Sequence, residues 1–155
     1  MSLMPPRSAP TFALLLVEDE PADAQIFTEL LGDMTDQITV YHVSNGQEAL
    51  DFLSRGSAYA HAPRPELIVL DLNMPVMSGL EFLRRAKIDE QMRAIPVMVL
   101  STSEHPRDIQ GAYHNYANGY VVKPGNIAEY QALLEKVTAY WNGAVRLPLI
   151  EDVAL

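Results

Sequence analysis

One apolar run that ends in a carboxylate constrains this chain more than any other feature. Residues 67–70 are four consecutive aliphatic side chains, and Asp71 follows them directly. A continuous run of this kind is typical of a strand buried on both faces of a parallel sheet. Ligands of such sheets bind at the carboxyl ends of the strands, so Asp71 lies where a functional group is expected. A lone aspartate can also cap a turn there, and the other strand ends decide between these interpretations.

The rest of the chain alternates strand and helix patterns. We expect strands at residues 12–17, 38–43, 67–70, 95–100 and 119–122, each followed by a helix, with the last helix running from about Asn126 to Gly143. Apolar spacing assigns one face of the first helix to Ala22, Ile26, Leu30 and Met34, and one face of the fourth to Ile109, Ala112, Tyr113 and Tyr116. Strict alternation predicts an α/β fold, a five-stranded parallel sheet with helices on both faces.

The length of 155 residues fits one domain, which we place at residues 12–143. The preceding segment, 1–11, is rich in proline, and we expect a disordered leader there. The final segment, 144–155, has no core of its own and is expected to contribute to an interface.

Composition excludes several classes of function. A net charge of −9 without any basic patch argues against nucleic acid and anionic membranes as partners. The absence of cysteine excludes disulfides, thiolate catalysis and cysteine-based zinc sites. No apolar stretch approaches the ~20 residues of a membrane span, and no targeting segment is evident. We therefore expect a cytoplasmic protein.

The strand ends carry a consistent chemistry. Glu18 and Asp19 close the first strand, Asp71 the third, Ser101 the fourth and Lys123 the fifth. In the order 2-1-3-4-5 the first and third strands are neighbours, so the three carboxylates share one crevice. Two carboxylates ~4 Å apart repel by roughly 4 kcal/mol at an effective dielectric constant near 20, which favours a hard divalent cation such as Mg²⁺. An adjacent lysine and hydroxyl suit the oxygens of a phosphoryl group.

These motifs resemble those of response regulator receiver domains. The resemblance covers residues 13 to about 141 and rests on five motifs in order, which are Leu16-Val17-Glu18-Asp19, Leu70-Asp71-Leu72-Asn73-Met74-Pro75, Gly79, Val99-Leu100-Ser101-Thr102 and Tyr120-Val121-Val122-Lys123-Pro124. It implies a flavodoxin-like fold, and the strand order used above rests partly on it. It also implies a phosphoacceptor switch of a two-component system with no output domain, not a conventional enzyme.

The resemblance assigns a role to each strand-end residue. Asp71 would accept a phosphoryl group from a phosphohistidine as an acyl phosphate. Lys123 would pair with Asp71 and then contact the phosphoryl oxygens. Ser101 would move to the phosphate, and Tyr120 would follow it inward. The Mg²⁺ ligands would be Glu18, Asp19, Asp71 and the backbone carbonyl of Asn73. Slow autodephosphorylation is expected, because neither Asn73 nor Ser103 is a strong base.

A softer resemblance links the chain to regulators of phytochrome histidine kinases. It rests on residues 59–65, on Ser101-Thr102-Ser103, and on Tyr140-Trp141 with residues 145–148. A histidine kinase of the phytochrome type is the partner that it implies.

Two alternatives to a phosphoacceptor switch stay open: a phosphatase similar to the haloacid dehalogenases, which forms an aspartyl phosphate, and a receiver-like binding module that is not phosphorylated.

An excess of apolar residues near the last helix predicts a homodimer. The candidates for an exposed apolar surface are Tyr113, Tyr116, Tyr130 and Trp141, with Val145 and Leu147 of the tail. The apolar residues of the last helix are together wider than the one stripe that an amphipathic helix buries, and they are Ile127, Tyr130, Leu134, Val137, Tyr140 and Trp141. We expect a two-fold interface on the fourth and fifth helices and the edge strand between them, with each tail crossing to the other subunit. The competing interpretation is that the tail covers this surface on its own subunit.

Overall fold

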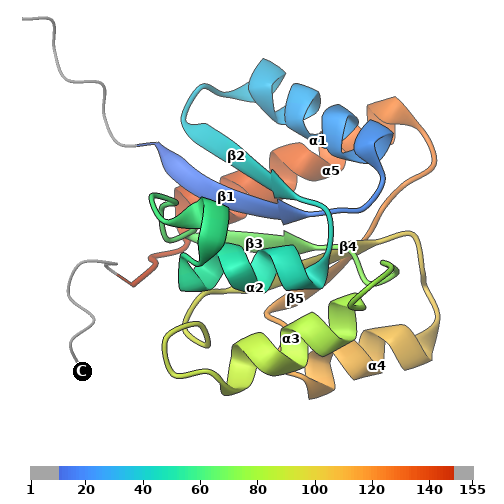
Figure 1. Cartoon of the computed structure of the whole chain (residues 1–155). Helices are drawn as coiled ribbons and strands as arrows, with labels where there is room; N and C mark the ends of the chain where they lie inside the picture. Colours follow the sequence, from blue (N-terminus) through green and yellow to red (C-terminus); the bar gives the residue numbers. More distant parts are fainter. Residues whose placement is uncertain (1–10, 149–155) are drawn as a thin grey trace, which may run out of the picture.

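A computed structural model describes residues 11–148, which form a five-stranded parallel sheet in the order β2-β1-β3-β4-β5 (Figure 1). The strands are β1 (Phe12–Val17), β2 (Ile38–Val43), β3 (Leu67–Leu70), β4 (Val97–Ser101) and β5 (Gly119–Val122). The helices are α1 (Pro21–Met34), α2 (Gly46–Ser54), α3 (Gly79–Ile88), α4 (Pro106–His114) and α5 (Ile127–Thr138), with a 3₁₀ turn η1 (Ser57–Tyr59) and a π-helical segment η2 (Ala139–Ala144). The expected fold class and strand order are confirmed.

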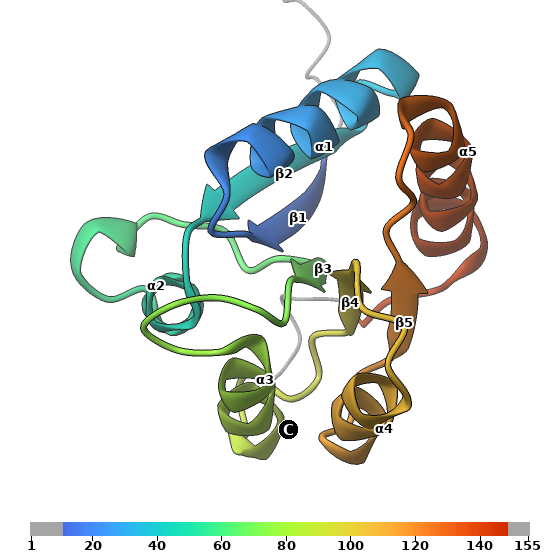
Figure 2. The same cartoon turned by 90° about the vertical axis from the view of Figure 1, so that its right-hand side faces the viewer.

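The helices cover both faces of the sheet, with α1 and α5 on one side and α2, α3 and α4 on the other (Figure 2). Strand side chains therefore alternate between two separate cores. Ile68 and Leu70 of β3 face α2 and α3, whereas Leu67 and Val69 face α1 and α5. Both sets are buried, which explains why the central strands are apolar at every position instead of at every second one.

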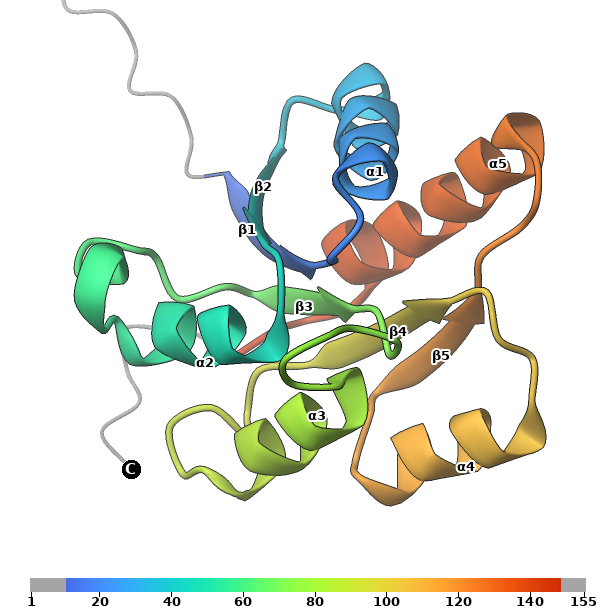
Figure 3. The ribbon, with the colours of Figure 1, turned by 45° about the vertical axis from the view of Figure 1, so that its right-hand side comes forward.

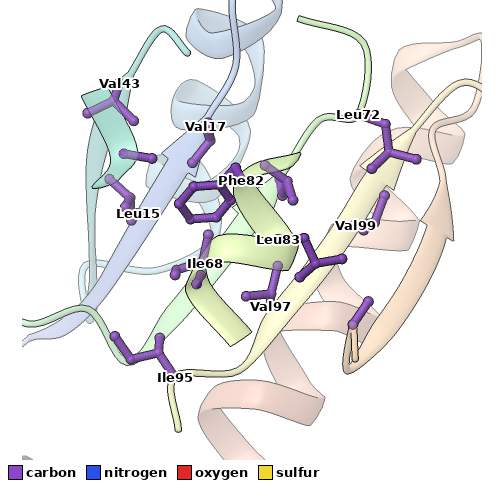
Figure 4. Packing of buried hydrophobic residues seen from close by; sticks show 14 of the residues in the cluster. Leu15, Val17, Val43, Ile68, Leu72, Phe82, Leu83, Ile95, Val97 and Val99 are labelled. Carbon is purple, nitrogen blue, oxygen red and sulfur yellow. The ribbon is translucent and has the colours of Figure 1, made fainter. Parts of the chain in front are cut away.

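The core beneath α3 is closed by two fully buried side chains. Phe82 and Leu83 lie over Ile68 and Val97 at the centre of the sheet (Figure 4). Burying a side chain of this size contributes roughly 1.5–3 kcal/mol to folding. This packing fixes α3, and with it the loop that leaves the end of β3.

The buried face of α1 differs from the expected one. The structure buries Ala24, Phe27 and Leu31 against the sheet, while Ala22 is exposed and Ile26 is half-buried. The helix has two adjacent apolar stripes, and the stripe that contains the large Phe27 ring removes more apolar surface from water. Leu30 and Met34 of the predicted stripe still pack against this core, but the fully buried positions lie about one residue further along.

The ends of β4 and α4 also differ from the expected ones. Strand β4 begins at Val97, because Pro96 has no N–H to donate to a neighbouring strand. Helix α4 ends at His114, where the chain reverses and the Ala117 N–H donates to the Ala112 carbonyl at 3.0 Å. Tyr116 follows the helix with a φ of 68° and is 72% exposed, so it is not part of the helical face predicted for it.

The C-terminal part of the described chain folds back on its own subunit. Tyr130 is buried, and Trp141 and Leu147 pack against the core formed by β1, α1 and α5. The prediction that Tyr130 belongs to an exposed surface was therefore wrong, and Trp141 and Leu147 are partly buried because their own core offers them apolar neighbours. Of the expected leader and tail, only Thr11 and residues 144–148 are described, and the remainder lies outside the described residues. No helix within residues 11–148 is both long and apolar enough to span a membrane.

A half-buried lysine at the end of α3 joins two loops at the amino-terminal edge of the sheet. The Lys87 ammonium group at the end of α3 donates to the carbonyl oxygens of Arg93 and Ile95 at 3.2 and 2.9 Å, and to Asn118 Oδ1 at 3.0 Å. Asn118 Oδ1 also accepts a hydrogen bond from the Val97 N–H at 2.9 Å, which begins β4. Burial lowers the pKa of Lys87 to about 8. The side chain thus connects α3 to the segments before β4 and β5.

We expect Lys87→Met to lower the free energy of unfolding by about 2 kcal/mol, because three acceptors lose a charged donor. Urea denaturation followed by circular dichroism measures this change. Lys136→Met on the exposed side of α5 is the matched control, and it should change stability by less than about 0.5 kcal/mol. Equal stabilities of the two variants would contradict the role assigned to Lys87.

Candidate functional site

Three carboxylates meet where β1 and β3 end side by side (Figure 3). Glu18 and Asp19 follow β1, and Asp71 follows β3. One carboxylate oxygen of each lies within 4.8 Å of the others. The Asp71 N–H donates to the Val17 carbonyl at 3.0 Å, which extends the pairing of the strands up to the site. The structure thus brings together the three acids that the sequence placed in one crevice.

The electrostatics of the cluster show a shortage of positive charge. Glu18 is only 4% exposed, and burial together with the charge of Asp71 raises the pKa of Glu18 to about 8. Burial also raises the pKa of Asp71 above its usual value, although the hydrogen bond from Glu18 opposes this rise. Near neutral pH Glu18 therefore retains a proton.

The donor set fits a hard divalent cation. Glu18, Asp19 and Asp71 each offer a carboxylate oxygen at one small site, and Mg²⁺ and similar ions prefer oxygen ligands of this kind. A cation bound there would replace the proton on Glu18 and offset the mutual repulsion of the three groups. Asn73 is exposed beside them, and its backbone N–H donates to Asp71 Oδ1 at 3.5 Å.

The loop after β3 is held close to α3 by a glycine. A Cβ atom on Gly79 would lie 2.3 Å from the Asp71 carbonyl oxygen and 2.6 Å from the Leu72 Cα, so no larger residue fits without displacing the backbone. The Gly79 N–H donates to the Leu72 carbonyl at 2.9 Å. This close approach fixes the backbone immediately after Asp71, which explains the glycine in the sequence motif.

Ser101 and Lys123 reach the site from β4 and β5. Ser101 is buried, its Oγ accepts a hydrogen bond from the Ser103 N–H at 3.1 Å, and its carbonyl accepts one from the Lys123 N–H at 2.8 Å. The Lys123 ammonium group lies 3.8 Å from the carboxylate of Asp23 in the first turn of α1. Its charge also opposes the rise in the pKa of both Glu18 and Asp71.

Asp23 is a site residue that sequence reasoning missed. The resemblance implied that Lys123 pairs with Asp71, but among the described residues the ion-pair partner of Lys123 within 4.0 Å is Asp23. Asp71 already shares a hydrogen bond with Glu18, and Asp23 offers a more exposed carboxylate to the lysine. Its position in the first helical turn, four residues after Asp19, was the available signal.

A hydrogen-bond network links the loop after β4 to β5 and α4. The Tyr120 hydroxyl donates to the Ser103 carbonyl at 2.8 Å, and the Ser103 hydroxyl bonds to the Asp108 carboxylate. The Tyr113 hydroxyl accepts a hydrogen bond from the Tyr120 N–H at 3.1 Å. Tyr120 therefore contacts the loop that follows Ser101. Ser101 and Tyr120 are the two residues to which the resemblance assigned a switch.

A shallow pocket of about 180 Å³ opens beside this site, between α1 and the start of α5. Its polar end is formed by Asp23 and Lys123, and its apolar walls by Ile26, Ile127 and Tyr130. Ile127 is 55% exposed, so the rim presents an apolar side chain directly to solvent.

Comparison with known proteins identifies relatives over nearly the whole chain. Residues 14–135 match the response regulator receiver domain family. Response regulator Rcp1 of Synechocystis is 34% identical over 145 residues, which cover 94% of this chain and 99% of Rcp1. Its structure in an Mn²⁺-bound form superposes with a TM-score of 0.82 at 34% identity and covers 88% of this chain and 99% of that one.

Two further solved structures are similar. The phosphorylated cyanobacterial phytochrome response regulator RcpA has a TM-score of 0.85 at 36% identity, over 90% of this chain and 99% of that one. A response regulator in red light signaling of R. palustris has a TM-score of 0.83 at 34% identity, over 91% and 99% of the two chains.

The proton on Glu18 predicts an unusual pH dependence of stability without metal. The pKa of Glu18 is about 8 in the folded chain and 4.5 without the fold, so the folded chain binds more protons between these values. The stabilising contribution is therefore complete below the lower value and is lost as the pH rises through the higher one. We expect the free energy of unfolding in EDTA to fall as the pH rises from about 5 to about 8.

Urea denaturation at a series of pH values measures this trend. Glu18→Gln should flatten it, whereas Glu20→Gln, which removes an exposed carboxyl nearby, should leave it in place. A wild-type chain whose stability rises over this interval would contradict the assignment.

Proposed function

This chain belongs to the response regulator receiver domain family, and we propose that Asp71 is the residue on which it accepts a phosphoryl group. The observation that carries this proposal is the cluster of Glu18, Asp19 and Asp71 with Lys123 beside it. Asp71 is the acid of the cluster that follows the central strand, and its neighbours supply cation-binding oxygens on one side and an ammonium group on the other. The donor is a phosphohistidine of a histidine kinase.

The transfer is an exchange of one bond to phosphorus for another. A carboxylate oxygen of Asp71 attacks the phosphorus atom, and the bond between phosphorus and the imidazole nitrogen of the kinase breaks, with the electron pair returning to that nitrogen. Mg²⁺, when bound by Glu18, Asp19, Asp71 and the Asn73 carbonyl, neutralises charge on the phosphoryl oxygens. Lys123 leaves Asp23 to contact a phosphoryl oxygen, since the ion pair at 3.8 Å is loose and the charge of Lys123 already acts on Asp71.

Ser101 and Tyr120 form the switch that responds to the phosphoryl group. Rotation of the Ser101 hydroxyl toward a phosphoryl oxygen releases the hydrogen bond that it accepts from the Ser103 N–H. That loop is bonded in turn to Tyr120 of β5 and to Asp108 of α4. The charge on Asp71 is thereby coupled to the position of β5 and α4, which face a protein partner.

The proposed kinase is of the phytochrome type. Support comes from the phytochrome regulator RcpA and the red-light regulator of R. palustris, which resemble this chain over nine-tenths of its length. Within the chain, the pocket beside Lys123 and Asp23 has an apolar rim that includes Ile127, and it suits a helix that presents a phosphohistidine.

We expect Asp71→Asn to abolish incorporation of labelled phosphate from a phytochrome kinase, because an amide cannot form the acyl phosphate. Incorporation by the wild type should require Mg²⁺ and should cease on chelation. Autoradiography of the separated proteins measures both. Uptake by Asp71→Asn, or uptake in the presence of a chelator, would contradict the assignment of the site.

A control variant and a decay measurement accompany this experiment. Asp89→Asn, at the far end of α3, should leave incorporation unchanged. On removal of the kinase, the labelled wild type should keep its phosphoryl group for minutes, because neither Asn73 nor Ser103 is a strong base and the Ser103 hydroxyl is bonded to Asp108. Decay within seconds would show that another residue activates the attacking water.

We further propose a homodimer built on α4, β5 and α5. Tyr113 and Tyr116 are 50% and 72% exposed beside the edge strand β5, and Ile127 of α5 is 55% exposed. Exposed aromatic residues at a sheet edge favour burial in an interface. Tyr116 also has a φ of 68°, a backbone conformation that costs a bulky residue of order 1 kcal/mol or more and that glycine or asparagine adopts readily. Retention of an aromatic ring there supports a role outside the subunit's own fold.

Tyr116→Asn tests this dimer without a loss of stability, since asparagine suits the left-handed backbone. We expect the dimer dissociation constant to rise by about tenfold or more, as for an interface residue at the centre of a contact. Sedimentation equilibrium at micromolar concentration measures it. Ile88→Asn, which replaces a 66% exposed side chain on α3, is the matched control. A wild type that remains monomeric, both intact and without residues 144–155, would rule the dimer out.

A further inference from the structure

A histidine on the edge strand β2 lies against the backbone of the acidic cluster. The His42 Nε2 atom is 2.7 Å from the backbone carbonyl oxygen of Glu18. A carbonyl oxygen can only accept a hydrogen bond, so the Nε2 atom must carry the proton and donate it. The four histidines of the chain have no metal-ligand spacing, so the sequence alone predicted no function for His42.

This contact gives the Glu18 carbonyl a hydrogen bond that the backbone of β2 does not supply. The β1–β2 pairing runs from Phe12 with Ile38 to Val17 with Val43, and the Glu18 N–H still donates to the Val43 carbonyl at 3.0 Å. Beyond Val43 the chain leaves β2 and turns into α2. Asn45, whose N–H would continue the parallel ladder to the Glu18 carbonyl, is the N-cap of that helix. The imidazole therefore satisfies the Glu18 carbonyl at the point where the ladder stops.

The peptide group held in this way joins two of the three acids. The Glu18 carbonyl and the Asp19 N–H belong to the same planar unit, so a bond to that carbonyl limits rotation on both sides of it. Fixing this plane fixes the directions in which the Glu18 and Asp19 side chains leave the backbone. The contact thus acts on the geometry of the carboxylates and not on their charge.

We propose that His42 is a positioning residue for divalent-cation binding by Glu18, Asp19 and Asp71. The inference rests on the proposed function, since it concerns the cation of the same site. Without the imidazole, the peptide between the first two acids gains freedom that must be lost again when the cation binds. The affinity for the cation falls, while the ligands themselves remain present.

The dissociation constant for Mn²⁺, measured from the electron paramagnetic resonance signal of the free ion, tests this role directly. At about pH 8.5, above the pKa of about 8 of Glu18, proton release from the cluster does not dominate the measurement. We expect His42→Ala to raise the dissociation constant about fivefold, which corresponds to one hydrogen bond of about 1 kcal/mol. His42→Gln, whose amide can donate to the same carbonyl, should restore it to within about twofold.

His61→Ala, which removes an exposed histidine between η1 and β3, is the matched control and should bind Mn²⁺ like the wild type. Equal dissociation constants for the wild type and His42→Ala would overturn this inference alone, even if His42→Ala were less stable in EDTA. A fivefold loss that His42→Gln does not restore would also overturn it. A wild type that does not bind Mn²⁺ would overturn the proposed metal site and this inference with it.

Discussion

The junction of β1 and β3 is the constraint on which the rest of the structure depends. Parallel pairing of these two strands brings the groups that follow Val17 and Leu70 to the same point. The electrostatic repulsion among the three acids gathered there is offset by the hydrophobic stabilisation of two cores, which bury both faces of the sheet. A sheet with one solvated face could relax around such a charge cluster, whereas this one has helices on each side that resist movement.

Much of the fold could be predicted from the sequence because its central strands are buried on both faces. An unbroken aliphatic run such as 67–70, bounded by Glu66 and Asp71, strongly favours a central strand, and the meeting of the acids at the strand ends follows from the topology. The face of α1 could not be predicted as well, because Phe27 and Ile26 lie on adjacent apolar stripes and only packing volume decides between them. The end of α4 was missed because Tyr116 occupies a left-handed position that usually belongs to glycine.

In the site, too, the residues could be predicted from the sequence, whereas their side-chain contacts could not. The strand-end residues could be found one by one, since each terminates a recognisable run. The contacts of Lys123 with Asp23 and of Lys87 with two loops depend on the directions of long side chains, which no sequence pattern specifies. The packing of Trp141 and Leu147 against the core was equally hidden, because the sequence does not reveal how far the segment after α5 folds back.

The packing of Trp141 has an optical consequence. It is the one tryptophan of the chain, and it lies with Phe12 and Leu67, the first residues of β1 and β3, at the edge of the sheet opposite the acids. Its ring also meets that of Tyr140 edge-on, with 5.1 Å between the centroids. The intrinsic fluorescence of this protein therefore reports on docking of the segment after α5, and a second fluorophore near Asp71 is needed to observe events at the acids.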